Sequence, residues 1–294
     1  MFDPRRPTLR YRLDKGETLG VTWLMMGSVA MTEIAAKARP DAIVLDLQHG
    51  LWERRAMEEA IGIVPSDIPV LVRVAENSPL AIGQALDAGA EGVIVPLVET
   101  AKQARKAVDA ARFPPHGNRS GGGVRPLCDF VDYVHGCERG IVVVVMIETE
   151  KGVKNAREIA AVEGVDMVFI GTGDLALSLG TFPHFDARHD VACATVHAAC
   201  KAEWTLCGCF TGNLDGARAR REKGYRMVVT SNDVDVLMRG FGQATAGFMA
   251  RTPAGPALPP EPKPSPRPAP SPAVSATPAN KAANGAGYVE EQRP

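Results

Sequence analysis

The sequence lacks several features that mark other classes of protein. The formal net charge of the 294 residues is −1, so no basic excess suggests nucleic acid or a membrane surface as a partner. No apolar run approaches the roughly 20 residues of a membrane span. No apolar segment of the secretory type follows the arginines near the N-terminus. These absences favour a small-molecule ligand, and we expect a cytoplasmic protein.

The six cysteines show no zinc-binding pattern. No CxxC pair occurs among them, and no histidine has the usual spacing from them. Cys207 and Cys209 stand two apart in an apolar run, where they would share one face of a strand. Two thiols alone do not make a metal site, so we expect reduced cysteines that serve packing.

The composition changes near Thr252. Pro, Ala and Ser dominate residues 252–294, and large apolar side chains nearly vanish there. Such a segment cannot bury enough apolar surface to offset the entropy of ordering it. We therefore expect one folded domain over residues 1–251 and a disordered, proline-rich tail over residues 252–294.

Eight short apolar runs alternate with amphipathic stretches before the tail. Strands that are apolar on both faces and alternate with helices indicate a parallel sheet with both faces covered. Eight such units in roughly 240 residues predict a closed (β/α)8 barrel, the TIM barrel. The runs are residues 19–25, 42–47, 70–74, 92–96, 141–147, 167–170, 206–210 and 227–230. Helical patterns include residues 79–88, 101–111, 153–162 and 214–223.

Polar residues follow several of these runs. The loops at the carboxyl ends of the strands carry the chemistry of a TIM barrel, so we expect these residues to converge on one face. They are His49, Arg73, Glu148, Asp174, Thr211 and Asn213.

Glu148 and Asp174 each come directly after a buried run or its short turn. A carboxylate in such a place is costly to bury unless it is paired or coordinates a cation. Mg²⁺ and Mn²⁺ are commonly held by two carboxylates and several waters, so the two residues predict a metal site. Carboxylates that cap helices or sit in loops are the alternative interpretation.

Arg73 and His49 are candidates for contact with a substrate. The planar guanidinium of Arg73 suits a carboxylate or phosphate, although a structural salt bridge is an equally good interpretation. His49 follows the second run, where an imidazole suits a general base, and a structural histidine is the alternative. A catalytic histidine is usually oriented by a carboxylate. Asp87, at the end of the helix before the fourth run, is the candidate if the geometry allows it.

Two glycine-rich segments call for interpretation. Residues 171–176 read GTGDLA, which is similar to a dinucleotide fingerprint, but Asp174 would repel a pyrophosphate and the segment does not open a Rossmann unit. We interpret it as a loop whose backbone N–H groups accept a small carboxylate while Asp174 binds metal. Residues 119–125, with three consecutive glycines in a long connection, form either a loop that closes over a ligand or a surface excursion.

Taken together and in order, these motifs resemble the HpcH/HpaI aldolase family, class II pyruvate aldolases of the phosphoenolpyruvate/pyruvate barrel superfamily. The resemblance covers residues 19–241. The segments that carry it are DLQH (46–49), LVRV (71–74), QALDAGAEGVIVP (84–96), RFPP (112–115), MIET (146–149) and FIGTGDL (169–175).

The resemblance implies a divalent cation, Mg²⁺, Mn²⁺ or Co²⁺, held by Glu148 and Asp174 and chelated by a pyruvate-type 2-oxo acid. It further implies that Arg73 steadies the keto oxygen and the enolate. Gly173 would lend a backbone N–H to the substrate carboxylate.

The resemblance also implies a base and an assembly. His49 would act through water, with Asp87 as its partner, supplied by the same or a neighbouring subunit. Family members are commonly hexamers, so we expect a homo-oligomer in which residues 232–250 pack on another subunit.

Three places depart from the family pattern. Leu47-Gln48 stand where the family has Gly-Glu, and Met146 stands where it has Gln. Thr172-Gly173 replace the usual Pro-Ala before the metal-binding Asp. These changes bear on substrate choice, metal affinity and rate.

The expected activity is cleavage of a 4-hydroxy-2-oxo acid to pyruvate and an aldehyde, or the reverse addition. No predicted strand ends in Lys, which argues against a Schiff-base route. Oxaloacetate decarboxylation, or another reaction of the pyruvate enolate at the same site, is one alternative. A catalytically weak binding or scaffold barrel is the other.

Overall fold

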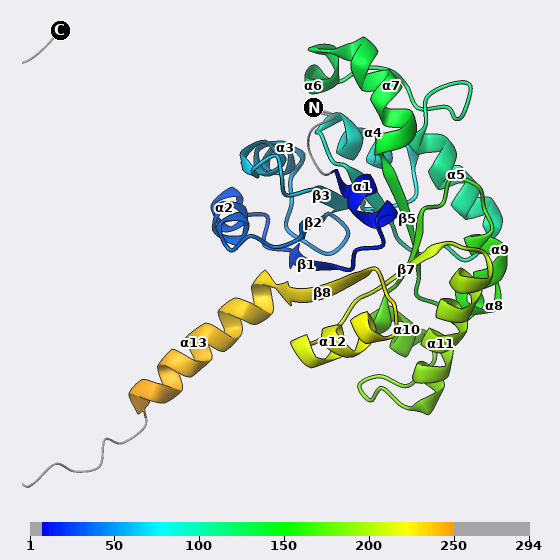
Figure 1. The fold of residues 1–294 in the computed structure, drawn as a ribbon. Coiled ribbons are helices and arrows are strands. Elements are labelled where there is room, and N and C mark those ends of the chain that lie inside the picture. The colour runs from blue at the N-terminus through cyan, green and yellow to red at the C-terminus, as the bar shows by residue number, and fades with distance from the viewer. Residues whose placement is uncertain (1–7, 250–294) are drawn as a thin grey trace, which may run out of the picture. The chain divides into compact units, whose positions relative to one another are not determined.

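The computed structural model describes residues 8–249, within which eight parallel strands form a closed barrel (Figure 1). Each strand pairs with its neighbours in chain order, and β8 returns to β1. The strands are β1 (Leu19–Leu24), β2 (Ala42–Asp46), β3 (Val70–Arg73), β4 (Gly92–Val95), β5 (Val142–Ile147), β6 (Met167–Ile170), β7 (Leu206–Cys209) and β8 (Met227–Asn232). The predicted TIM barrel is therefore confirmed, and every strand overlaps the run expected for it.

Helices connect the strands and surround the barrel (Figure 1). In chain order they are α1 (Leu9–Asp14), α2 (Val29–Lys37), α3 (Arg54–Ile63), α4 (Pro79–Asp87), α5 (Ala101–Ala111), α6 (Val124–Leu127), α7 (Phe130–Gly140), α8 (Glu150–Lys154), α9 (Ala156–Ala160), α10 (Thr172–Ser178), α11 (Ala187–Ala202), α12 (Leu214–Glu222) and α13 (Asp233–Met249). The observed α5 has the predicted bounds, and α4 and α12 each end one residue earlier than predicted.

The strand side chains form two apolar layers. On β5, Val144 and Met146 face the barrel interior, whereas Val145 and Ile147 pack outward against the helices. Successive side chains of a strand point to opposite faces, so a strand that is covered on both sides must be apolar throughout. This explains why the strands are visible in the sequence as continuous apolar runs.

Helix α1 closes the N-terminal end of the barrel. Its Leu9 and Leu13 are buried and belong to the interior apolar cluster. The backbone N–H of Leu9 donates to the Glu91 carboxylate at 2.9 Å, and Glu91 immediately precedes β4. The sequence pattern did not predict this helix, because six residues give too little periodicity to recognise.

One predicted helix is divided in the structure. Residues 153–162 were expected to form a single helix, but α8 and α9 meet at Asn155, where the backbone leaves helical geometry. The Asn155 side chain donates to the Glu99 carbonyl at 2.7 Å. This bond ties the junction of α8 and α9 to Glu99, in the loop that follows β4.

The glycine-rich segment 119–125 packs against the C-terminal end of α4. Gly123 has a φ of +92°, and a Cβ there would lie 2.8 Å from Cβ of Asp87. Arg125 donates to the carbonyls of Ala88 and Glu58. The segment is therefore held against α4 and leads into α6, which the sequence analysis did not predict.

The remaining expectations concern cysteines, membrane helices and the tail. The cysteines are free, and all but Cys128 are buried, in agreement with a packing role. Between residues 8 and 249, no helix is both long and apolar enough to cross a membrane. The tail predicted for residues 252–294 lies outside the described residues.

Replacing Leu9 with Ala should lower the free energy of unfolding by about 2 to 5 kcal/mol, because it leaves a cavity at the closed end of the barrel. Urea unfolding followed by circular dichroism measures the change. Leu80→Ala is the matched control, since Leu80 is 69% exposed and its loss should change stability by less than about 0.5 kcal/mol. Equal effects of the two substitutions would contradict the role assigned to α1.

Candidate functional site

The alternation of strand side chains brings three ionisable residues into the mouth of the barrel. On β2, Ala42 and Val44 face the interior, so Asp46, two residues further on, faces the same way. The same alternation turns Arg73 inward at the end of β3 and Glu148 inward just after β5. All three are buried.

Asp46 and Arg73 form a buried ion pair. They lie side by side as the last residues of β2 and β3. Nε of Arg73 donates to Oδ1 of Asp46 at 2.8 Å, and Nη2 donates to Oδ2. Burial alone would raise the pKa of Asp46, but the hydrogen bonds and charge of Arg73 outweigh it and hold the pKa below its ordinary value. The salt bridge considered for Arg73 thus exists, and it leaves Nη1 outside the pair.

Trp23 supports this pair from inside the barrel. Its indole Nε1 donates to Oδ2 of Asp46 at 3.1 Å. Its ring centroid is 5.1 Å from the Arg73 guanidinium carbon, and the ring stacks on Phe169 at 5.8 Å. Because Trp23 is fully buried, the guanidinium lies on a rigid aromatic surface.

Glu148 has one oxygen with a partner and one without. Oε1 accepts the backbone N–H of Leu97 at 2.7 Å, whereas Oε2 is buried and has no hydrogen-bond partner among the described residues. Burial raises the pKa of Glu148 to about 7; the bond from Leu97 and the charge of Arg73 oppose the rise, and the charge of Asp174 adds to it. A Cβ at Gly171 would lie 2.3 Å from Oε2, so only glycine fits there.

Asp174 lies beside Glu148, in the first turn of α10. It is half-buried, and its charge is close enough to Glu148 to raise the pKa of that carboxyl. The neighbouring Gly173 is exposed, with nothing within 4 Å of the position a Cβ would take. The structure therefore brings the two predicted metal ligands together.

The two carboxylates fit a hard divalent cation. Such ions prefer carboxylate oxygens, and a buried oxygen without a partner calls for a bound ion or water. In residues 8–249 no group of three or more His, Cys, Asp or Glu side chains is arranged to hold a metal. A cation held by Glu148 and Asp174 would thus take its remaining ligands from water or substrate.

His49 and Gln48 lie on the loop that follows Asp46. Their backbone N–H groups donate to Oδ1 of Asp46 at 3.2 Å and 3.0 Å respectively. The His49 side chain is exposed, and Oε1 of Gln48 is buried with no hydrogen-bond partner among residues 8–249. The imidazole is therefore accessible at the mouth.

Asp87 lies at the other end of the barrel from His49. Helix α4 begins after the carboxyl end of β3 and ends, at Asp87, before the amino end of β4. There Oδ1 of Asp87 accepts Nη2 of Arg119 at 2.7 Å. The pairing of His49 with Asp87 does not form within one chain.

Two other polar residues expected at the mouth, Thr211 and Asn213, form hydrogen bonds with backbone groups of the fold. The hydroxyl of Thr211 donates to the carbonyl of Val229. Oδ1 of Asn213 accepts the N–H of Gly216 at 2.8 Å and caps α12.

Residues 20–239 match the HpcH/HpaI aldolase/citrate lyase family. The chain belongs to this family.

Similar proteins within the HpcH/HpaI group include named aldolases. A 4-hydroxy-2-oxovalerate aldolase of Rhodococcus jostii is 36% identical, over 80% of this chain and 93% of its own length. A hydroxypyruvate/pyruvate aldolase of Rhizorhabdus wittichii is 33% identical, over 78% and 93%. The crystal structure of a family protein from Burkholderia cenocepacia superimposes with a TM-score of 0.78 at 34% identity, covering 82% of this chain and 99% of that one.

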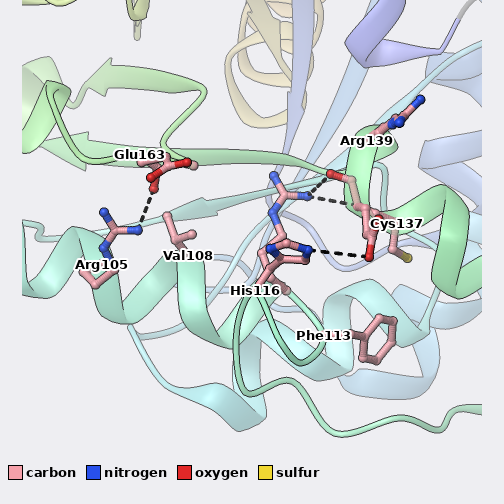
Figure 2. Close-up of a pocket in the computed structure, with 10 residues that line it drawn as sticks. Arg105, Val108, Phe113, His116, Cys137, Arg139 and Glu163 are labelled. Carbon is pink, nitrogen blue, oxygen red and sulfur yellow. Dashed lines mark hydrogen bonds and ion pairs between the residues drawn. The ribbon is translucent and has the colours of Figure 1, made fainter.

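In this HpcH/HpaI family member, a cavity of about 490 Å³ lies away from the mouth (Figure 2). Its Arg112 donates to the carbonyls of Cys137 at 2.9 Å and Ile141 at 3.2 Å, at the end of α7 and just before β5. Figure 2 shows Arg105 directed at the Glu163 carbonyl, 2.9 Å away. Both arginines donate to carbonyl groups that precede β5 or β6, at the N-terminal end of the barrel. The cavity is therefore separate from the carboxylate site.

Sequence reasoning did not select two residues of this HpcH/HpaI site, Asp46 and Trp23. A signal for Asp46 was present, because it stands two residues after Val44 in a strand with an inward-facing apolar face. Trp23 carries no such signal, since an aromatic residue in an apolar strand is usually part of the core.

Glu148→Gln should stabilise the cation-free protein at high pH but not at low pH. A folded-state pKa of about 7, against 4.5 for the free group, means that the folded state holds the proton longer. The free energy of unfolding of the wild type therefore falls by about 3 kcal/mol in all as the pH rises from below 4.5 to above 7. Glutamine removes this loss.

The measurement is urea unfolding with EDTA at about pH 5 and pH 8. We expect the mutant's advantage over wild type to grow by most of that amount between the two pH values, and to disappear when Mn²⁺ is added in excess. An advantage that is the same at both pH values would contradict the assignment.

Proposed function

We propose that this chain is a divalent-metal-dependent aldolase that cleaves a 4-hydroxy-2-oxo acid to pyruvate and an aldehyde, or catalyses the reverse addition. The observation that supports the proposal most is the buried Oε2 of Glu148, which has no hydrogen-bond partner in the part of the chain that the structure describes and lies near Asp174. The named aldolase activities of the similar proteins agree with it.

Glu148 and Asp174 would hold the cation, which can be Mg²⁺, Mn²⁺ or Co²⁺ because both ligands offer only oxygen. When bound, the cation supplies Lewis-acid stabilisation of the charge that develops on the former keto oxygen. Because burial and the charge of Asp174 raise the pKa of Glu148 to about 7, binding of the cation would displace the proton that Glu148 holds near neutral pH.

Arg73 would donate from Nη1 to the keto oxygen as charge develops there. Asp46 occupies Nε and Nη2, and Trp23 lies against the guanidinium plane, so the free edge has a fixed direction. A donor whose direction is set before the reaction costs no reorganisation during it. Gly173, exposed and without a Cβ, leaves room for its N–H to reach the substrate carboxylate.

His49 would take the proton of the 4-hydroxyl group through water as the C3–C4 bond breaks. Its exposed position at the mouth suits contact with the distal part of the substrate. Asp87 lies at the opposite end of its own barrel and would orient His49 only from a second copy. A homo-oligomer is therefore part of this proposal.

Oxaloacetate decarboxylation is a second candidate for the same site. Among the described residues, no carboxylate side chain is bonded to the His49 ring, and decarboxylation needs no hydroxyl proton to be removed. Pyruvate release from oxaloacetate and from a 4-hydroxy-2-oxo acid, assayed side by side, distinguishes the two candidates. A panel of aldehydes with pyruvate or hydroxypyruvate as donor then identifies the preferred aldol reaction.

Glu148→Ala and Asp174→Ala should each abolish metal-dependent turnover, since each removes one of two protein ligands. Calorimetric titration of the metal-free protein with Mn²⁺ measures the affinity directly. Asp215→Ala, at an exposed carboxylate of α12, is the control and should bind Mn²⁺ as wild type does. Unchanged affinity in both site variants would remove the basis of the proposal.

His49→Ala should lower kcat/KM for aldol cleavage by about 10²- to 10⁴-fold, the usual contribution of a general base. Oxaloacetate decarboxylation should suffer less, because Arg73 and the cation suffice to hold the enolate. Both rates are compared at saturating metal. A structural histidine would affect the two reactions equally, and that outcome, or no loss in either, would exclude His49 as the base.

A further inference from the structure

The segment that carries Asp174 combines anchored residues with glycines. Leu175 and Ala176 are buried, and the N–H of Gly171 donates to the carbonyl of Ile147 at 3.2 Å. Gly171 precedes α10 and makes no side-chain cap, and Gly173 is exposed with no atom near its Cβ position. Glycine has more backbone freedom than any other residue. Contacts from outside the segment therefore help to fix the first turn of α10, to which Asp174 belongs.

The Thr172 hydroxyl provides the first such contact. Oγ1 of Thr172 donates to the carbonyl of Phe210 at 3.1 Å. Phe210 is itself fixed to the barrel, because its N–H donates to the carbonyl of Ile170 at 3.0 Å. This hydrogen bond joins the start of α10 to the end of β7.

His189 provides the second contact, from α11. Its side chain is 2% exposed, and Nε2 lies 3.1 Å from the carbonyl oxygen of Thr172. A carbonyl only accepts, so Nε2 carries the hydrogen and Nδ1 is left to face the thiol of Cys193, 3.9 Å away. The ring also packs edge-on against Phe185, with centroids 4.9 Å apart.

We propose that Thr172 and His189 are positioning residues that fix the Asp174 carboxylate for the divalent cation. The inference rests on the proposed function. The two hydrogen bonds act on one residue from opposite sides, the hydroxyl toward β7 and the carbonyl toward α11. Thr172 is therefore held at both its side chain and its backbone, two residues before the ligand.

The effect on the cation follows from the small number of ligands. Within residues 8–249 no third protein ligand accompanies Glu148 and Asp174, so none of these residues compensates for a shift of the α10 backbone. Groups that orient a metal ligand typically change metal affinity by about 10- to 100-fold when they are removed. Neither Thr172 nor His189 touches the reacting atoms, so their contribution should appear in metal affinity and vanish at saturation.

The experiment measures Mn²⁺ affinity in the metal-stripped, full-length chain from the electron paramagnetic resonance signal of free Mn²⁺. Thr172→Val removes the hydroxyl without changing the size of the side chain, and His189→Leu removes the ring donor. Each should raise the Kd for Mn²⁺ about tenfold or more. Thr172→Ser and His189→Gln retain a donor and should stay within about threefold of wild type. At saturating Mn²⁺, kcat should return to near the wild-type value.

His197→Leu is the matched control. His197 lies on the same helix but stacks on Tyr225, with centroids 4.3 Å apart. It should leave the Kd for Mn²⁺ unchanged, and an equal loss in this variant would overturn the inference by showing a general effect of α11. If His189→Leu does not fold, Thr172→Val and Thr172→Ser carry the test alone.

The Glu148→Ala and Asp174→Ala variants separate the two proposals. Wild-type affinity in Thr172→Val and His189→Leu, together with lost affinity in the two ligand variants, would overturn the positioning role and leave the proposed function standing. Wild-type affinity in all four would overturn both. Weaker binding that serine and glutamine do not restore would also contradict the role of these hydrogen bonds.

Discussion

A charge placed at the end of a barrel strand must be paired or coordinated, because the closed barrel withholds water from it. The described structure meets this constraint in two ways. Asp46 is satisfied by Arg73, Trp23 and two backbone N–H groups, and its pKa is held low. Glu148 is satisfied at one oxygen only, and its pKa is high. The same barrel thus contains one buried carboxylate, Asp46, whose two oxygens both accept hydrogen bonds from the protein. It also contains a second, Glu148, whose Oε2 atom accepts none from the described residues.

The strands and the approximate place of the site could be predicted from the sequence, because burial on both faces leaves continuous apolar runs. The residues at the ends of those runs follow from the two-residue alternation. Helix α1 could not be predicted this way, because its position depends on contacts with β4, far away in the sequence. At the division between α8 and α9, the Asn155 side chain donates a hydrogen bond to the carbonyl of Glu99. Because these residues are far apart in the sequence, no local pattern predicts this contact. Asp87 was predicted to orient His49 because it is a carboxylate. Its place at the opposite end of the barrel from His49 follows only from the course of α4.

Residues that depart from the family pattern are connected to the carboxylates. Met146 faces the interior, and its Cε would lie 3.0 Å from a Cβ on Gly171, next to Oε2 of Glu148. An apolar side chain there contributes to the burial that raises the pKa of Glu148. Gln48 brings to the same mouth an amide oxygen that no described residue hydrogen-bonds. Thr172 adds a hydroxyl where the family pattern has proline. These substitutions change what surrounds the two carboxylates and leave the carboxylates themselves in place.

The closure of the barrel by α1 has a kinetic consequence. Leu9 and Leu13 fill the interior at the N-terminal end, and Trp23 stacks on Phe169 within the same cluster. A substrate of the proposed aldolase would therefore enter and leave the described barrel from the side of Glu148 and Asp174. In an aldolase of the proposed kind, the acid fragment would lie deepest and the aldehyde fragment nearest to solvent. The aldehyde would then depart first, and the synthetic direction would require the acid to enter before its acceptor. Product-inhibition patterns would accordingly show ordered binding and release, because both fragments would pass through the same end of the barrel.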